Sequence, residues 1–289
     1  MKYKLRHETV YTYVNSVDNY QSVLCLRPLT LPTQHCHSFD LVIEPQPVKI
    51  YARTDFFGNT QHYFSLHESH KILRVIATSG VEVLPKISPQ ISTITCQQAR
   101  ASFRENKALK IETLQYQLPS YFIEWDDEIK AFAETCLLPH TPLFEGVSKL
   151  SAKIFNEFKF KSGATNINTP LKTVLKERRG VCQDFSHLAI ACLRSVGLAA
   201  RYVSGYIETL PPVGKPKLQG SDASHAWISV YIPDMGWCEF DPTNNLIPSD
   251  KHIITAYGRD YVDVAPLKGI IFSSGEHKVA VQVDVLREG

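Results

Sequence analysis

The sequence predicts an α+β protein in which an N-terminal antiparallel β-sandwich precedes a core made of a helix packed on an antiparallel sheet. Residues 1–95 contain short β-prone segments separated by Pro and Gly, without a helical period. Apolar side chains recur every three or four positions in 185–196, and the residues after that segment alternate as in strands. We therefore divide the chain into an N-terminal β domain (1–95), a helical connector (96–146), a core (147–250) and C-terminal strands that complete the core (251–289).

Composition and charge narrow the kind of partner that the protein can have. Lys plus Arg number 31 and Asp plus Glu number 29, so neither a nucleic acid nor a strongly anionic partner is predicted. No segment is apolar for long enough to cross a bilayer, and the first residues lack the hydrophobic stretch of a signal peptide, so no membrane partner is predicted. Seven irregularly spaced cysteines are typical of free thiols in a reducing compartment, which predicts a cytoplasmic protein.

The N-terminal β domain is predicted from alternation and from turn signals. Tyr3 and Leu5 alternate with charged residues, and later β-prone segments end at Pro28 and Pro45. Residues 55–59 (Asp-Phe-Phe-Gly-Asn) carry a Gly-Asn turn signal between two further segments. Short strands joined by frequent turns indicate a small sandwich.

A cluster in this domain, His35-Cys36-His37, contains residue types that bind metals. A closed metal site needs a second nearby pair of ligands, and the neighbouring sequence contains none. The chain also lacks a Cys-x-x-Cys motif. A polar loop after Pro32 accounts for the cluster, so neither a metal nor another cofactor is predicted.

Helices are predicted in the middle of the chain. Residues 97–110 are polar and form a connector with some helical character. A helix is predicted to begin at Asp126, because an acidic first turn follows this residue. Two more helices are predicted, one capped by Ser148 and one with Thr169 as N-cap and Pro170 at the first helical position.

The next helix is amphipathic and carries a cysteine at its start. Its apolar stripe consists of Phe185, Leu188, Ala189, Cys192, Leu193 and Val196. Gly180 precedes the helix, and Gly197 stands where a left-handed C-terminal cap is expected. Cys182 therefore lies at the first turn, where unpaired N–H groups and the positive end of the helix dipole favour a thiolate. The alternative for Cys182 is a buried structural thiol.

Strand-like segments follow this helix. Residues 199–207 are β-prone, and Pro, Gly, Lys and Ser are frequent in 211–224, which predicts a loop suited to cover a site. Residues 225–232 alternate cleanly. Their even-numbered members are apolar and face the core, whereas His225 and Trp227 share the other face.

A hairpin is predicted to bring Asp241 close to His225. The register is set if Ile232 pairs with Gly236 across a short loop. Asp241 then lies opposite Trp227 and diagonal to His225, at about 7–8 Å between the backbones. A loop that is one residue longer or shorter would place Asp241 on the other face.

Cys182, His225 and Asp241 together provide a thiol nucleophile, a proton carrier and an orienting carboxylate. They lie in three of four motifs that occur in order along the chain, namely 180–184 (Gly-Val-Cys-Gln-Asp), 201–206 (Arg-Tyr-Val-Ser-Gly-Tyr), 225–227 (His-Ala-Trp) and 241–243 (Asp-Pro-Thr). The motifs resemble those of the bacterial transglutaminase-like proteins, in the papain-like cysteine enzyme class. Residues 55–59 also resemble the N-terminal β region of this family, and 258–261 resemble its C-terminal extension, so that nearly the whole chain is covered.

The resemblance implies a transglutaminase-like core with Cys182 as nucleophile, His225 as general base and acid, and Asp241 as the orienting carboxylate. The backbone N–H of Cys182 would contribute to the oxyanion hole. Animal transglutaminases also use an upstream tryptophan there. The upstream tryptophan in this chain is Trp125, well before the cysteine, so the second oxyanion donor is unassigned. No Asp-x-Asp-x-Asp-Gly loop is present, so calcium activation is not implied.

Three functions agree with these residues. The first is hydrolysis of a peptide or amide bond in a peptide or protein substrate, through a thioester, as in a cysteine protease or amidase. The second is protein crosslinking by a protein-glutamine gamma-glutamyltransferase, in which a lysine amine replaces water. The third is a non-catalytic interaction module that keeps the fold. We expect hydrolysis, because no sequence feature excludes water from the site.

Overall fold

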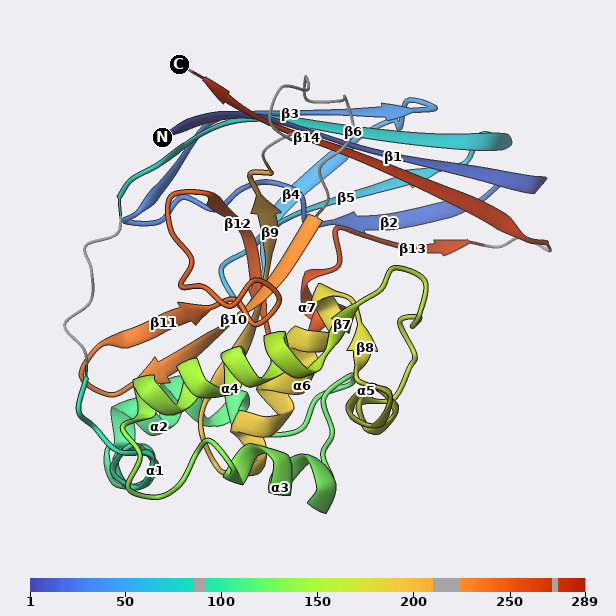
Figure 1. The fold of residues 1–289 in the computed structure, drawn as a ribbon. Helices are drawn as coiled ribbons and strands as arrows, with labels where there is room; N and C mark the ends of the chain where they lie inside the picture. The colour runs from blue at the N-terminus through green and yellow to red at the C-terminus, as the bar shows by residue number, and fades with distance from the viewer. Residues whose placement is uncertain (86–91, 210–223, 272–274, 289) are drawn as a thin grey trace, which may run out of the picture.

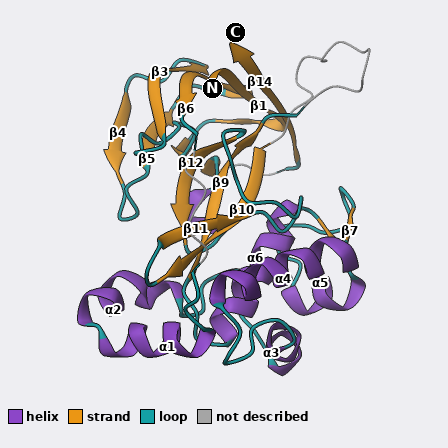
Figure 2. Ribbon diagram, turned by 60° about the vertical axis from the view of Figure 1, so that its left-hand side comes forward, coloured by secondary structure: helices purple, strands orange, loops and turns teal. Residues whose placement is uncertain are grey.

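The computed structural model describes residues 1–85, 92–209, 224–271 and 275–288. Two antiparallel sheets form a sandwich at one side of the molecule, and a third antiparallel sheet forms the core next to it (Figure 1). Most of the helices lie on the side of the core sheet that faces away from the sandwich (Figure 2). The predicted α+β class with an N-terminal antiparallel sandwich is confirmed. The loop predicted over 211–224 lies outside the described residues, except for its last residue.

The sandwich is built mainly from the first 83 residues. Its first sheet has the order β14-β1-β6-β3, with β14 (His277–Glu288), β1 (Lys2–Val17), β6 (His70–Val83) and β3 (Gln34–Glu44). Its second sheet has the order β13-β2-β5-β4, with β13 (Leu267–Ile271), β2 (Tyr20–Leu24), β5 (Thr60–Leu66) and β4 (Ile50–Thr54). Buried residues of both sheets share one core, which includes Tyr13, Leu24, Phe64, Leu66, Leu73 and Val75.

Two of the C-terminal strands differ from the sequence-based assignment. We expected 251–289 to complete the core, and β12 (His252–Gly258) does so by pairing with β9 (Ala200–Ile207) of the core sheet. In contrast, β14 pairs with β1 and β13 pairs with β2, in the sandwich. Alternation along 277–286 predicts a strand without predicting its neighbour. The neighbour is set by pairing between the two ends of the chain, as in Lys2 with Glu288.

The core sheet has the order β11-β10-β9-β12. Its strands are β11 (Gly236–Phe240), β10 (Ser224–Ile232), β9 (Ala200–Ile207) and β12 (His252–Gly258). The cysteine helix, α6 (Cys182–Ser195), packs on this sheet. The apolar residues that alternate along β10, namely Ala226, Ile228, Val230 and Ile232, are buried together with the apolar stripe of α6.

The remaining helices are α1 (Cys96–Glu105), α2 (Lys107–Thr113), the 3-10 helix η1 (Leu114–Tyr116), α3 (Asp127–Glu134), α4 (Leu143–Glu157), α5 (Leu171–Glu177) and α7 (Tyr261–Val264). Helices α3, α4 and α5 pack against α6, whereas α7 packs against β12 and β9. A short parallel pair joins β7 (Lys159–Phe160) to β8 (Arg179–Gly180). Among the helices of the described residues, none combines the length and apolar character that crossing a bilayer requires.

The helix starts test the predicted caps. Asp126 is the N-cap of α3, as predicted, and its carboxylate accepts a hydrogen bond from the backbone N–H of Ile129 at 3.0 Å. The prediction that Ser148 caps a helix is wrong, because α4 begins at Leu143 and Ser148 donates within the helix to the carbonyl of Phe144. In α5 the N-cap is Pro170 and not the preceding threonine.

Two buried amide side chains from the sandwich hold the outer edge of β12. Gln34 donates to the carbonyl of Ile254 and accepts from the N–H of the same residue, both at 2.8 Å. Asn59 does the same at Tyr257, at 2.7 and 2.8 Å. These contacts supply the hydrogen bonds that a further strand would make along an exposed sheet edge. The sandwich thereby fixes the position of β12 in the core sheet.

Candidate active site

The backbone that leads into α6 places Cys182 at the first position of this helix. The carboxylate of Asp184 accepts hydrogen bonds from the backbone N–H of Val181 and from the hydroxyl of Thr165, both at 2.7 Å. A Cβ atom on Gly180 would lie 2.7 Å from Asp184 Oδ2, so glycine leaves the space for this carboxylate. Gly180 and Asp184 of the 180–184 motif thus determine where the helix begins. The backbone N–H groups of its first turn, which have no acceptor within the helix, lie next to the thiol.

The hairpin between β10 and β11 has the predicted register. Ile232 pairs with Gly236, and the ladder ends where Ile228 pairs with Phe240. The next residue, Asp241, therefore lies opposite Trp227 and on the same face as His225. Gly236 has φ 78°, a left-handed conformation that glycine adopts without strain and that the tight turn requires.

The structure brings Cys182, His225 and Asp241 together. His225 Nε2 lies 2.7 Å from Asp241 Oδ2, and these two residues are 8% and 0% exposed. The thiol of Cys182 also forms a hydrogen bond with His225, and this bond, like the one to Asp241, raises the pKa of the histidine. Because Nε2 faces the carboxylate, Nδ1 is the ring nitrogen that is left for the thiol.

The charges of this group are set by competing effects. Burial acts to lower the pKa of His225, but hydrogen bonds to Asp241 and Cys182 outweigh it and raise that pKa to about 9. Burial acts to raise the pKa of Asp241, but hydrogen bonds from His225 and His252 hold it well below its usual range. At neutral pH the histidine is therefore an imidazolium ion that faces a buried carboxylate on one side and the thiol on the other.

Two further residues complete the surroundings of Asp241. The side-chain amide of Asn244 donates to Asp241 Oδ2 at 2.7 Å, and His252 Nε2 lies 3.2 Å from the same oxygen. The backbone N–H groups of Thr243 and Asn244 donate to Oδ1, at 3.0 and 3.2 Å. The sequence analysis did not identify either Asn244 or His252. An Asp two and three residues before these N–H groups is a local turn signal. His252 lies 11 residues after Asp241, on a strand that is two places away from β10 in the sheet, and no local pattern predicts that placement.

The motifs around Gly205 and Trp227 shape the pocket that holds the two histidines. Trp227 is completely buried, stacks on His225 at 5.8 Å between ring centroids and meets His252 edge-to-face at 5.1 Å. Its indole N–H points to Glu239, 3.4 Å away. A Cβ atom on Gly205 would lie 2.7 Å from the ring of Trp227 and 2.0 Å from the carbonyl oxygen of Ile253. Glycine is therefore required where β9 passes beneath the indole.

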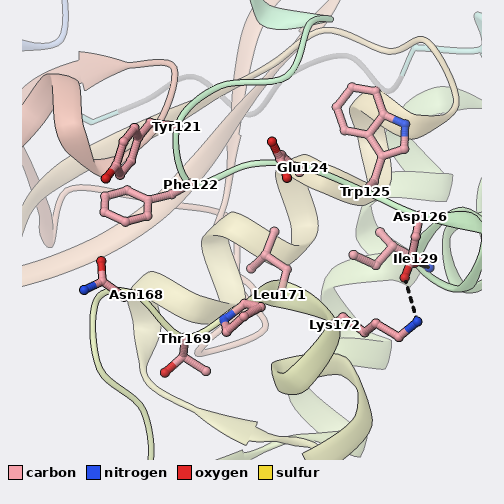
Figure 3. Close-up of a pocket in the computed structure, with 11 residues that line it drawn as sticks. Tyr121, Phe122, Glu124, Trp125, Asp126, Ile129, Asn168, Thr169, Leu171 and Lys172 are labelled. Carbon is pink, nitrogen blue, oxygen red and sulfur yellow. Dashed lines mark hydrogen bonds and ion pairs between the residues drawn. The ribbon is translucent and has the colours of Figure 1, made fainter.

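Trp125, the upstream tryptophan of the sequence analysis, lines a separate cavity of about 280 Å³. This cavity lies between residues 121–129 and 168–172 (Figure 3). Asp126 and Lys172 form an ion pair at 3.3 Å on its wall. Phe122, another lining residue, stacks on His187 of α6 at 5.6 Å. The structure thus gives Trp125 a place in the wall of this cavity, and the second oxyanion donor stays unassigned.

Potential metal ligands come together at one place in the described part of the chain. His225, Asp241 and His252 offer ligand atoms that lie within 4.8 Å of one another. In the structure the two histidine nitrogens each form a hydrogen bond to the same oxygen of Asp241. In the His35-Cys36-His37 cluster, the thiol donates to the carbonyl of Ser38 and His37 pairs with Glu82 at 3.4 Å.

Comparison with known proteins gives related sequences over the whole chain. Residues 3–82 match the bacterial transglutaminase-like N-terminal region, and residues 130–242 match the transglutaminase-like superfamily. An uncharacterized protein of Mycobacterium tuberculosis is 37% identical over 290 residues, which cover 99% of this chain and 92% of that protein. An uncharacterized protein of Mycobacterium leprae is 32% identical over 82% of this chain and 81% of its own length.

A solved structure shares the fold. The crystal structure of a candidate cysteine protease from Cytophaga hutchinsonii superposes with a TM-score of 0.79 and 23% sequence identity, covering 100% of this chain and 92% of that one. The predicted transglutaminase-like core is thereby confirmed at the level of the fold. With both segments matched and a relative that is 37% identical over nearly its full length, the chain belongs to the transglutaminase-like superfamily and carries the bacterial transglutaminase-like N-terminal region ahead of its core.

Proposed function

We propose that this protein is a cysteine-dependent enzyme that transfers the acyl group of a peptide or amide bond to water through a thioester on Cys182. The observation that carries this proposal is the contact of a helix-start thiol with His225, whose other ring nitrogen lies 2.7 Å from a buried carboxylate. Few structural roles call for a thiol, an imidazole and a carboxylate in this order. The same order is the one that the family resemblance implies.

In the first step, the thiolate of Cys182 attacks the carbonyl carbon of the substrate and a C–S bond forms. The developing oxyanion accepts a hydrogen bond from the backbone N–H of Cys182, which has no acceptor within the helix. The imidazolium of His225 then gives its proton to the leaving nitrogen, the C–N bond breaks and the amine leaves. Asp241 stabilises the charge on the ring and fixes its orientation throughout.

In the second step, neutral His225 takes a proton from a water molecule, and the resulting hydroxide attacks the thioester carbonyl. The C–S bond breaks, the carboxylic acid leaves and the thiolate–imidazolium pair is restored. The raised pKa of His225, about 9, supports the first step because the ring carries its proton before the leaving group needs it. It also means that the pair forms again readily after each turnover.

The substrate proposed is a peptide or a protein, since a thiolate attacks carboxamides of either kind. A lysine amine in place of water would make the same thioester the intermediate of crosslinking. All seven cysteines, each within the described residues, lie outside disulfide bonds, which supports a cytoplasmic setting where thiols stay reduced.

The proposal is tested by incubating the protein with a glutamine-containing casein, with and without a fluorescent primary amine. We expect release of peptides or ammonia in both samples and no fluorescence on the casein. Fluorescent casein would replace hydrolysis by crosslinking as the function. The proposal is wrong, and the chain is a non-catalytic module, in either of two cases. In the first case the wild-type protein forms neither product. In the second case it forms no more product than the Cys182→Ala variant.

A further inference from the structure

Two histidines contact the same carboxylate oxygen in the candidate site. Nε2 of His225 and Nε2 of His252 lie 2.7 and 3.2 Å from Asp241 Oδ2. His252 is 2% exposed and begins β12, two strands away from β10 in the core sheet. The proposed mechanism uses His225 alone, so it leaves the second imidazole without a role.

The surroundings of His252 fix its charge and its tautomer. Its Nδ1 atom is buried and has no hydrogen-bond partner among the described residues. An unprotonated Nδ1 can stay without a partner at little cost, whereas a protonated Nδ1 would be a buried donor without an acceptor. Nε2 therefore carries the single proton and donates it to Asp241. Burial also lowers the pKa of His252, although its neighbour is a carboxylate.

The strand that carries His252 is held from both sides. Gln34 and Asn59 of the sandwich bind the backbone of β12 at Ile254 and Tyr257. Gln34 is itself 2% exposed and donates a further hydrogen bond to the carbonyl of Leu29. On the inner side, the ring of Trp227 meets His252 edge-to-face. The imidazole of His252 is therefore placed by packing and by backbone contacts that do not involve Asp241.

We propose that His252 is a positioning residue of the apparatus formed by Cys182, His225 and Asp241. It donates a hydrogen bond to Asp241 as a neutral imidazole, keeps that buried group a carboxylate, and leaves His225 as the single ring that carries the catalytic proton. The proposal rests on the proposed function. It also gives the N-terminal β region a part in the chemistry, because that region holds the strand on which His252 lies.

The test compares two substitutions at this position. In His252→Gln the amide N–H stands close to where Nε2 was, so the donor is kept, whereas His252→Leu removes it. The readout is the rate at which iodoacetamide alkylates Cys182 between pH 4 and 10, together with kcat and KM for peptide hydrolysis. The groups that titrate near His252 are Asp241, His225 and Glu239. His62→Leu serves as control, because His62 is another buried histidine, stacked on Phe39 in the sandwich.

With His252→Leu we expect kcat to fall by up to about 100-fold, as for a slightly misplaced catalytic group, with little change in KM. The acidic limb of the alkylation profile should move to higher pH, because Asp241 has lost a donor and is protonated more easily. His252→Gln should restore the wild-type profile, and the control should match wild type. A leucine variant with the wild-type rate and profile, or a glutamine variant as impaired as leucine, would overturn the proposal.

A second measurement uses the wild-type protein, so that it does not depend on any variant folding. Nitrogen NMR of labelled histidines should show His252 as a neutral ring with its proton on Nε2 at neutral pH. A protonated His252 at neutral pH, or a proton on Nδ1, would overturn the proposal. Wild-type Cys182 that alkylates no faster than a free thiol would instead contradict the proposed function, which keeps the two failures distinct.

Discussion

The two ends of α6 carry the same residue type in opposite settings. Cys182 starts the helix, is half-buried and contacts His225. Cys192, one of the last residues, is completely buried, and its thiol lies 3.9 Å from the carbonyl of Ile129. Burial raises the pKa of the Cys192 thiol, so that it stays neutral in the apolar core. The difference shows that the place in the helix decides how exposed each thiol is and whether it contacts a histidine.

The end of α6 that holds Cys192 is also the anchored end. Arg194 is 2% exposed and donates to the carbonyls of Ala200, Leu118 and Arg259 and to the hydroxyl of Ser120, at 2.7–3.1 Å. These contacts tie the helix to β9 and to the segments before α3 and α7. One end of the helix is therefore rigidly fixed by a buried cation, while the other end presents its N–H groups and thiol to the site.

Replacing the two cysteines gives the largest contrast. Cys182→Ala should abolish hydrolysis, because no other group in the site can form the thioester. Cys192→Ala should keep the activity of the folded protein and cost about 1 kcal/mol or more of unfolding free energy, since it leaves a small cavity. Hydrolysis rates and urea unfolding curves of both variants check this. Equal activity of the two variants would remove the distinction between the two ends.

The carboxylate beside His225 gives the next largest effect. Asp241→Asn should lower kcat by less than the roughly 10⁴-fold loss known for a serine triad, because a cysteine thiol gives up its proton more readily than a serine hydroxyl. The amide NH₂ would also meet N–H donors on either side of the group, which should cost about 1–3 kcal/mol of stability. Asp250→Asn, further along the chain, is the control. If Asp241→Asn turns over at the wild-type rate, Asp241 has no part in the reaction.

A substitution at the anchored end of α6 should lower the stability of the protein without lowering its activity. Arg194→Met should lower the unfolding free energy by about 3 kcal/mol or more, because several buried carbonyls lose their donor. The matched variant at the other end, Arg179→Met, breaks an exposed ion pair with Glu177 and should cost less than about 1 kcal/mol. Urea denaturation measures both. Similar losses for the two arginines would show that Arg194 does not anchor the helix.

The last contrast is the pH dependence of stability. The pKa of His225 is raised to about 9, so its contribution is complete below its ordinary pKa of 6.5 and disappears as the pH rises through 9. Burial lowers the pKa of His187, in the middle of α6, to about 4, so its contribution is present above 6.5 and disappears as the pH falls toward 4. In a plot of unfolding free energy against pH, His225→Gln should flatten the alkaline side, and His187→Phe should flatten the acidic side. Curves of unchanged shape would contradict these assignments.

Local patterns predicted the parts of the site that depend on one element or one hairpin. The apolar stripe located α6, and alternation with a short turn gave the register that places Asp241 on the face of His225. The cap of α3 also followed from its acidic first turn. In each case the information lies within about a dozen residues of the feature that it predicts.

Contacts between distant segments could not be predicted in the same way. His252 reaches Asp241 because β12 pairs with β9, and β12 is held by Gln34, which lies 220 residues away from Ile254 in the sequence. The pairing of β14 with β1 joins the two ends of the chain. The alternation of apolar and polar residues predicts each of these strands. It does not predict the neighbouring strand, because every strand edge offers the same backbone N–H and C=O groups.

The contrast within α6 is tested most directly by the alkylation of its two cysteines. Native protein is treated with limiting iodoacetamide at several pH values between 5 and 10, and mass spectrometry follows the peptides that contain Cys182 and Cys192. We expect Cys182 to be modified first at neutral pH, because it is partly exposed and contacts His225. Cys192 should stay unmodified until the protein unfolds, because burial raises the pKa of its thiol. Equal labelling of the two cysteines in the folded protein would contradict the account of Cys182 as the reactive thiol.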